Sequence, residues 1–243
     1  MLRSAAMKAC LGLLVLAAAL GAAELPQPVA VDPGGPGKPP SDAVVLFNGK
    51  DLSGWQQADG APAKWTVKNG EMVCNTESGN ILTKETFGSA QIHVEFATPD
   101  QREATGQARG NSGVYVQGRY EVQVLDSYNN PTYADGSASA IYKQSAPLVN
   151  ASRPPEQWQT YDIIYRAPKC YGGHIIGPGS MTILHNGVLV QDHFELQGPT
   201  PGGLKEPFDP CKPGPILLQA HVHPQVAETA MRFRNLWVRK LDH

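Results

Sequence analysis

The segment Gly110–Asp126 combines a strand pattern with side chains that can bind a polar ligand or transfer a proton. Its second half alternates strictly, so an extended chain places Arg119, Glu121 and Gln123 on one face and apolar residues on the other. A carboxylate in this setting can act as an acid or a base, because partial burial raises its pKa toward neutrality. A solvated sheet face with a weak Arg119–Glu121 ion pair would produce the same pattern. The rest of the chain must therefore decide between the two interpretations.

The composition is that of an ordinary globular protein. The chain has 243 residues, of which 41% are hydrophobic and 17% charged, which is enough to bury one sizeable core. The formal net charge is −2, and the basic residues are scattered rather than clustered. This distribution excludes a nucleic-acid-binding protein, which needs a concentrated basic surface.

The N-terminal region has the features of a secretory signal peptide. Arg3 and Lys8 come before an apolar run that ends in small residues at position 23. The run is short for a membrane span, and no second apolar stretch comes after it, so we expect an exported protein, periplasmic or secreted, without a membrane anchor after cleavage. Residues 24–40 are rich in proline and glycine, which predicts a disordered linker before a folded domain at 41–243.

The cysteines suggest one disulfide in the mature chain. Cys10 lies inside the apolar run of the signal peptide, which leaves three cysteines. Cys170 and Cys211 both lie in loops rich in proline and glycine, and we expect these two to pair in an oxidising compartment. Cys74 falls in a strand pattern and is expected to pack as a small apolar residue.

Short strand patterns dominate the chain between residues 43 and 238. Asn69-Gly70 and Asn186-Gly187 are favoured hairpin turns, and residues 91–97 alternate polar with apolar side chains. No window of a dozen residues shows a sustained helical period. Roughly ten or more short strands without a helix predict an all-β jelly-roll sandwich of two antiparallel sheets.

Seven motifs occur in the order found in one known family. They are Leu46–Trp55, Gly110–Tyr115, Glu121–Asp126, Trp158–Ile163, Asn186-Gly187, Gly214–Gln219 and Arg232–Asn235. On these motifs the chain resembles the DUF1080 family over about Val44–Leu241. This family is described as the 3-keto-disaccharide hydrolase domain, or 3-keto-α-glucoside 1,2-lyase and 3-keto-2-hydroxyglucal hydratase. The resemblance implies a concanavalin-like jelly roll with a carbohydrate on its concave sheet, and an exported location.

The reaction implied by the resemblance differs from ordinary glycoside hydrolysis. A ketone at C3 of a sugar acidifies the proton at C2, so a base can remove that proton. The substituent at C1 then leaves by β-elimination, and water can add to the resulting 3-keto-2-hydroxyglucal. The protein must supply a base, a group that stabilises the enolate and an acid for the leaving oxygen.

Three residues are candidates for these catalytic roles. Glu121 is the candidate acid or base, and His221, in a Gln-x-His motif like that of the family, is its candidate partner. Arg234 is the candidate electrophile at the C3 oxygen, although a solvated arginine on an outer face explains it equally well. Strict alternation places Arg234 opposite a face formed by Phe233 and Trp237.

Six further residues are candidates for substrate binding. Amide and charged side chains would bind sugar hydroxyls and Tyr142 could stack on a sugar face, although packing in the core is the usual role of such aromatics. Asp126 shares the face of Glu121 only if a bulge interrupts the strand, and is otherwise a turn residue. The six are Asn111, Arg119, Gln123, Asp126, Tyr142 and Gln219.

A divalent metal ion is a further expectation, because a cation would stabilise the enolate. His221 with Glu121 could bind it, and His221 with His223 is an alternative pair.

Two other functions fit the same residues. A glycan-binding module without activity is one, because residues 220–230 depart from the family pattern. A conventional two-carboxylate glycoside hydrolase is the other, since Glu121 and Asp126 have the outer spacing of the Glu-x-Asp-x-x-Glu signature of laminarinase-like hydrolases. Gln123 replaces the middle carboxylate of that signature, which argues against the second alternative.

Overall fold

A computed structural model describes residues 25, 27–35, 37–205, 209–223 and 230–241. The predicted signal peptide lies outside the described residues. One compact unit spans Val31–His243. The described residues between 31 and 40, from the second half of the predicted linker, are grouped with this unit by their contacts. No helix in the described part of the chain is long and apolar enough to cross a membrane.

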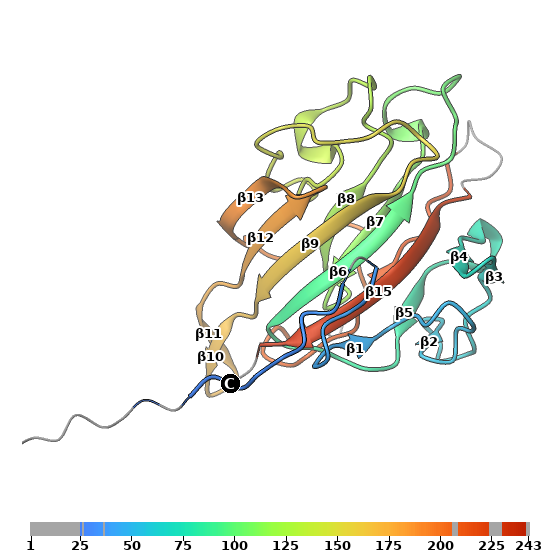
Figure 1. The fold of residues 1–243 in the computed structure, drawn as a ribbon. Helices are drawn as coiled ribbons and strands as arrows, with labels where there is room; N and C mark the ends of the chain where they lie inside the picture. The colour runs from blue at the N-terminus through green and yellow to red at the C-terminus, as the bar shows by residue number, and fades with distance from the viewer. Residues whose placement is uncertain (1–24, 26, 36, 206–208, 224–229, 242–243) are drawn as a thin grey trace, which may run out of the picture. The chain divides into compact units, whose positions relative to one another are not determined.

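Two antiparallel sheets form the folded unit, as the sequence predicted. The larger sheet has the strand order β13-β12-β9-β6-β15-β4-β3, with β1 pairing to β15. Figure 1 shows β13, β12, β9, β6 and β15 side by side in front of the strands of the second sheet. The strands of the larger sheet are β1 (Val44–Val45), β3 (Thr66–Lys68), β4 (Glu71–Val73), β6 (Ala90–Ala97), β9 (Gln159–Arg166), β12 (Ser180–His185), β13 (Val188–Glu195) and β15 (Arg232–Lys240).

The smaller sheet has the order β2-β5-β14-β7-β8, and a separate two-stranded hairpin joins β10 to β11. Three single turns of 3-10 helix, η1 to η3, interrupt the loops. These elements are β2 (Trp55–Gln56), β5 (Ile81–Thr83), β7 (Ser112–Val116), β8 (Tyr120–Val124), β10 (Lys169–Tyr171), β11 (His174–Gly177), β14 (Leu217–Leu218), η1 (Thr76–Ser78), η2 (Gly106–Ala108) and η3 (Ala134–Gly136).

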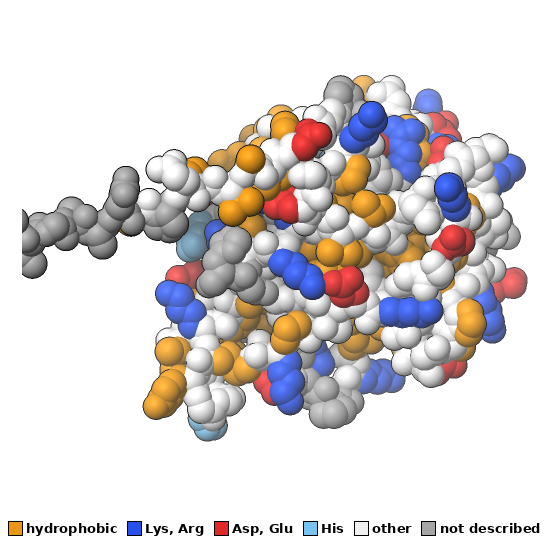
Figure 2. Space-filling model, turned by 60° about the horizontal axis from the view of Figure 1, so that its bottom comes forward, with side chains coloured by type: hydrophobic (Ala, Val, Ile, Leu, Met, Phe, Trp, Pro, Cys, Tyr) orange, Lys and Arg blue, Asp and Glu red, His pale blue; other side chains and the backbone are white. Residues whose placement is uncertain are grey.

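The core fills the space between the two sheets. Alternate residues of β6, β9 and β8 point into it, among them Ile92, Ile163 and Val122, all fully buried. The residues between them point outward, so each sheet has one apolar and one polar face. On the surface in Figure 2, acidic and basic side chains are interspersed among apolar ones, without a large area of a single charge.

The predicted cysteine chemistry is confirmed. Cys170 on β10 and Cys211 form a disulfide, with their Cα atoms 5.8 Å apart. Cys74 is free and buried, and burial raises the pKa of its thiol to about 12, which leaves it unreactive at neutral pH.

A β-bulge in β15 overturns the predicted alternation of this strand. Asn235 has a left-handed φ of 48°, and the register with β6 shifts between Arg234 and Trp237. The extra residue reverses the facing of the residues that come after it. Phe233 points into the core as predicted, but Trp237 lies on the same outer face as Arg234.

Candidate active site

A cleft on the outer face of the smaller sheet gathers most of the predicted site residues. We call it the Glu121 pocket, and its volume is about 210 Å³. Its floor comes from β7 and β8, and its walls come from four loops. The lining residues are Gln107, Asn111, Tyr115, Glu121, Gln123, Tyr133, Tyr142, Pro201, Gly202, Gln219 and His221.

The β7–β8 hairpin places Glu121 in this cleft. Three residues, Gln117–Arg119, connect the paired residues Val116 and Tyr120. Gln117 and Gly118 both have positive φ (53° and 65°), and the Arg119 N–H donates to the Val116 carbonyl at 3.0 Å, as in a type I′ turn. The register set by this turn pairs Glu121 with Tyr115 and Gln123 with Gly113. Tyr120, Val122 and Val124 on β8 point into the core. The residues between them, Glu121 and Gln123, therefore point outward into the pocket.

Glu121 is a buried carboxyl group that is protonated at neutral pH. The residue is only 3% exposed, and this burial raises the pKa of the carboxyl to about 8, although a hydrogen bond with the Tyr115 hydroxyl acts in the opposite direction. Its backbone N–H donates to Thr200 Oγ1 at 2.9 Å, so a loop covers this part of the edge of β8. A protonated carboxyl in a cleft is a ready proton donor.

Gly113 makes room for the Glu121 carboxyl. A Cβ atom at position 113 would lie 2.3 Å from Glu121 Oε1 and 2.9 Å from a ring carbon of Tyr115. The carboxyl therefore lies directly over the backbone of β7, and only glycine allows this approach.

Amide side chains line the pocket around the carboxyl. Asn111 Nδ2 donates to the backbone carbonyl of Gln107 at 2.8 Å, which fixes its orientation. With its nitrogen turned toward Glu121, the Gln123 amide donates to Glu121 Oε1 at 3.1 Å and to the Ser112 carbonyl at 3.2 Å. These amides offer neutral donors and acceptors to hydroxyl groups.

His221 and Gln219 enter the pocket from the segment after β14. Partial burial, together with the nearby His223, lowers the pKa of the His221 imidazole, so the ring is neutral at pH 7. Gln219 Nε2 donates to the Tyr115 hydroxyl at 3.1 Å, and the oxygen of that hydroxyl lies 3.1 Å from the Pro201 carbonyl oxygen. The pocket thus holds a neutral imidazole and a protonated carboxyl.

A pair of tyrosines forms the rim of the pocket. The hydroxyl groups of Tyr133 and Tyr142 lie 2.8 Å apart, and the Nζ of Lys143 lies 3.4 Å from the centre of the Tyr133 ring. Tyr142 was predicted as a site residue, whereas Tyr133 and Gln107 were missed. Gln107 lies in the single turn η2 and Tyr133 directly before η3, where no strand period marks which side chains point toward the cleft.

Arg234 does not share this pocket, so the expectation that it joins Glu121 and His221 is wrong. It lies on the larger sheet, where its Nε donates to Glu95 Oε2 at 2.6 Å and its guanidinium stacks over Trp158 at 4.0 Å. The two sheets present opposite outer faces, which separates Arg234 from the Glu121 carboxyl.

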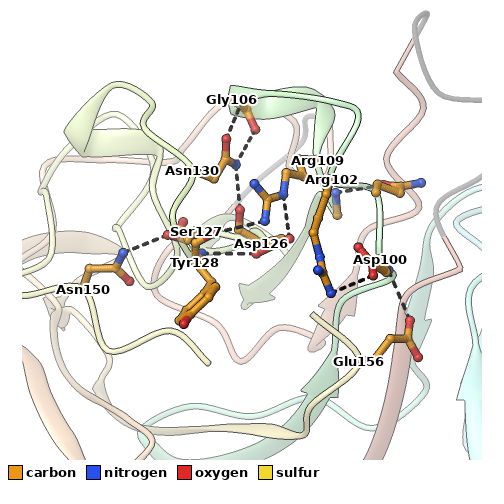
Figure 3. Close-up of polar contacts among 12 residues, drawn as sticks. Asp100, Arg102, Gly106, Arg109, Asp126, Ser127, Tyr128, Asn130, Asn150 and Glu156 are labelled. Atoms are coloured by element: carbon orange, nitrogen blue, oxygen red, sulfur yellow. Dashed lines mark hydrogen bonds and ion pairs between the residues drawn. The ribbon is translucent and has the colours of Figure 1, made fainter. Parts of the chain in front are cut away.

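Arg119 and Asp126 also lie outside the pocket. Arg119 precedes β8 and lines a different cavity, beside Gln117 and Lys212. Asp126 is fully buried and accepts a hydrogen bond from Arg109 Nε at 2.7 Å and another from the Tyr128 N–H at 3.1 Å, as Figure 3 shows. Asp126 therefore anchors the loop after β8 and does not face a substrate.

The described residues do not provide a conventional metal site. No group of three or more His, Cys, Asp and Glu side chains in the described ranges is arranged to bind a metal ion. Glu121 and His221 share the pocket with neutral amides and phenols, while the rings of His221 and His223 have centroids 6.4 Å apart. This donor set does not fit a resident divalent ion, and we derive no chemical step through one.

Amides, phenols, a carboxyl and an imidazole in one cleft suit a ligand that is rich in hydroxyl groups. The chain belongs to the family of the 3-keto-alpha-glucoside-1,2-lyase-like domain, which matches residues 42–239. The predicted family is therefore confirmed.

Solved structures agree with this assignment. A candidate glycosyl hydrolase from Parabacteroides distasonis ATCC 8503 is 42% identical, with a TM-score of 0.82 over 91% of this chain and 95% of that chain. A second candidate glycosyl hydrolase from the same organism is 19% identical, with a TM-score of 0.61 over 83% of this chain and 94% of the other, and shows the fold alone. No curated protein sequence is significantly similar to this chain.

Proposed function

We propose that the protein cleaves 3-keto-glycosides by β-elimination and hydrates the resulting 3-keto-2-hydroxyglucal. The observation that carries this proposal is the pairing of a protonated carboxyl with a neutral imidazole in one cleft. Two titratable groups whose pKa values are shifted in opposite directions are suited to act as acid and base.

In the elimination, His221 is the base. Its neutral imidazole takes the proton from C2 of the 3-keto sugar, and the electron pair forms an enolate with the C3 carbonyl. Glu121 then donates its proton to the oxygen leaving C1, so the C1–O bond breaks while the C1–C2 double bond forms. The side-chain amides of Asn111, Gln123 and Gln219 supply hydrogen-bond donors for the enolate oxygen and the ring hydroxyls.

In the hydration, the same two residues act in reverse. The Glu121 carboxylate left by elimination takes a proton from water as the water oxygen attacks C1. The imidazolium of His221 returns its proton to C2, which restores both groups to their starting states. One pocket can therefore supply both half-reactions without another proton donor.

The proposed location is outside the cytoplasm. The Cys170–Cys211 disulfide supports this location, because such bonds persist in oxidising compartments. Detection of the mature protein in periplasmic and secreted fractions, with N-terminal sequencing, would test both the location and the cleavage of residues 1–23.

The proposed activity is tested with the purified mature protein and a 3-ketoglucoside, with and without EDTA. We expect release of the aglycone, formation of the glucal and its conversion to the hydrated 3-keto sugar. Loss of activity in EDTA would show that a metal is required. The Glu121→Gln and His221→Asn variants should lose activity while still binding the substrate.

Two outcomes would contradict the proposal. Sugar binding without turnover by the wild-type protein would favour a glycan-binding module. Hydrolysis of laminarin, which carries no ketone, would favour a conventional glycoside hydrolase.

A further inference from the structure

A second cavity, with a volume of about 630 Å³, lies on the outer face of the larger sheet. Outward side chains of β6, β9 and β15 form its floor, and residues of the 31–40 segment form one wall. In Figure 1 this N-terminal segment crosses in front of β6 and β15. We call this cavity the outer-face pocket. Its volume falls within the range of small-molecule sites, about 300–1,000 Å³.

The floor of the outer-face pocket combines an aromatic surface with a carboxylate. The His93 and Trp237 rings are stacked, with centroids 5.1 Å apart and planes 12° apart. His93 Nδ1 lies 2.7 Å from Asp162 Oδ1, which fixes the orientation of the imidazole. The bulge in β15 is the feature that brings Trp237 to this outer face.

The bulge also fixes a second carboxylate at the pocket. Arg234 Nε donates to Glu95 Oε2 at 2.6 Å, and Asn235 Nδ2 donates to Glu95 Oε1 at 2.8 Å. Burial alone would raise the pKa of Glu95, but these hydrogen bonds outweigh it and hold the pKa below its usual range. Glu95 is therefore ionised and held in place.

Arg239 is fixed in the same way at the other end of the floor. Its guanidinium donates to both carboxylate oxygens of Asp42 at 2.7 Å and to Gln91 Oε1 at 2.9 Å. The polar groups of the pocket are thus held by one another before any ligand arrives. Such preorganisation lowers the entropic cost of binding.

The charges of the lining are balanced. Lys38 and Arg239 are the basic lining residues, and Glu95 and Asp162 are the acidic ones. A phosphate or a polycation would need an excess of one sign. Amides, a hydroxyl and balanced charges beside a tryptophan instead suit a neutral ligand that alternates hydroxyl groups with C–H faces.

We propose that the outer-face pocket is a second carbohydrate site, which binds a neutral saccharide that needs no ketone. It lies on the sheet opposite the Glu121 pocket, so one protein can hold an unoxidised sugar chain at one face and a reacting sugar at the other. This site goes beyond the proposed function, because its binding does not depend on catalysis.

The test uses the mature protein carrying Glu121→Gln, so that no sugar is turned over. Cellobiose, maltose and trehalose are titrated while the indole N–H signals of the four tryptophans are observed by NMR. We expect at least one sugar to shift the signal of Trp237, which lines the pocket although only 7% of the residue is exposed, and to leave unchanged the signals of Trp55 and Trp65, which belong to the core cluster and line no part of this pocket.

A blocking variant locates the binding. Thr160 lies on β9 in the pocket floor, and Thr160→Tyr would fill the cavity with a phenol ring. We expect this change to weaken saccharide binding about tenfold or more. Thr66→Tyr, at an exposed position of β3 on the same sheet, is the matched control and should bind like the parent protein.

The proposal is overturned if none of the three sugars shifts the Trp237 signal, or if the Thr160→Tyr variant binds them as tightly as the control. Failure of the protein to act on a 3-ketoglucoside would leave this result unchanged, because the binding is measured in a protein that cannot catalyse the reaction.

Discussion

Glu121 and His221 depart from their ordinary pKa values in opposite directions for one physical reason. Burial disfavours the charged form of each group, so it raises the pKa of the acid to about 8 and lowers that of the imidazole below 6.5. The acid is therefore protonated and the base unprotonated over the same range of pH. A separate catalytic water or ion is not needed to explain why both groups are in their active forms.

A bell-shaped pH dependence of kcat/KM is expected for 3-ketoglucoside cleavage. The acidic limb should report protonation of His221 below pH 6.5, and the alkaline limb should report ionisation of Glu121 near pH 8. The measurement is kcat/KM across this range in buffers of constant ionic strength. A rate that keeps rising through pH 9 would contradict the role of Glu121 as the acid.

The Glu121→Gln variant should lose activity and gain stability at neutral pH. In the unfolded chain the carboxyl ionises near 4.5, whereas in the folded protein it ionises near 8. The folded state therefore binds more protons between these values, and stability falls as the pH rises through them. Removing the titrating group should add on the order of 2–3 kcal/mol at pH 7. Urea unfolding of both proteins near pH 5 and pH 8 measures this, and an equal effect at the two values would contradict it.

Gly113→Ala should abolish activity with a modest effect on stability. The added methyl group would meet the Glu121 carboxyl at 2.3 Å and force it out of place. We expect kcat to fall at least about 100-fold, because a misplaced catalytic group costs about that much. Gly54→Ala is the control, since its added Cβ would make only an ordinary contact at 3.6 Å. Activity of Gly113→Ala equal to that of the control would show that Glu121 has no catalytic role.

At the scale of elements, hairpins and one bulge decide which side chains reach each pocket. The Gln117-Gly118 turn sets the register of β7 and β8 and thereby brings Glu121 to the cleft. The bulge at Asn235 shifts β15 by one residue and brings Trp237 to the outer-face pocket. Strict alternation predicts the facing of side chains correctly for β8 but wrongly for β15. A pattern with a period of two does not reveal where a bulge adds a residue.

The strand β12 carries a buried histidine that should make the fold sensitive to acid. His185 is fully buried, its Nε2 lies 2.8 Å from Gln159 Oε1, and burial lowers the pKa of the imidazole to about 4. The unfolded chain binds the proton first, so stability should fall as the pH drops from 6.5 toward 4. The loss should reach about 3 kcal/mol.

The His185→Gln variant tests this expectation. It retains an amide that can donate to Gln159 but has no group that titrates in this range. Urea unfolding at pH 7 and near pH 4.5 should show a smaller acid-induced loss of stability than in the wild-type protein. Parallel pH dependences in the two proteins would mean that other groups cause the acid sensitivity.

For the whole molecule, two sheets packed around one core leave two outer faces, each with its own pocket. The disulfide ties the β10–β11 hairpin to the loop at Cys211, across 41 residues of sequence. The Cys170→Ser/Cys211→Ser variant should lose about 4 kcal/mol of stability through the freer unfolded chain. Chemical unfolding of both proteins measures the difference, with Cys74→Ala as a control for the loss of a cysteine side chain. A loss no larger than that of the control would contradict the prediction.

The sequence by itself determined the family, the all-β class, the disulfide and the facing of Glu121 and Gln123. These properties depend on local patterns: a strand period of two, turn dipeptides and the spacing of motifs. The pairing of Cys170 with Cys211 could be chosen because few cysteines remain in the mature chain.

Only the tertiary structure decided which distant residues meet. It placed His221 in the same pocket as Glu121 and Arg234 on the opposite sheet, and it buried Asp126 against Arg109. Such contacts join residues far apart in the chain and depend on sheet order, a bulge and loop paths. Local sequence patterns do not predict the sheet order, the bulge or the loop paths, because these depend on the packing of the whole core. The 31–40 segment is a further example. Its proline-rich composition predicts disorder, but in the folded protein it contacts the larger sheet and forms a wall of the outer-face pocket.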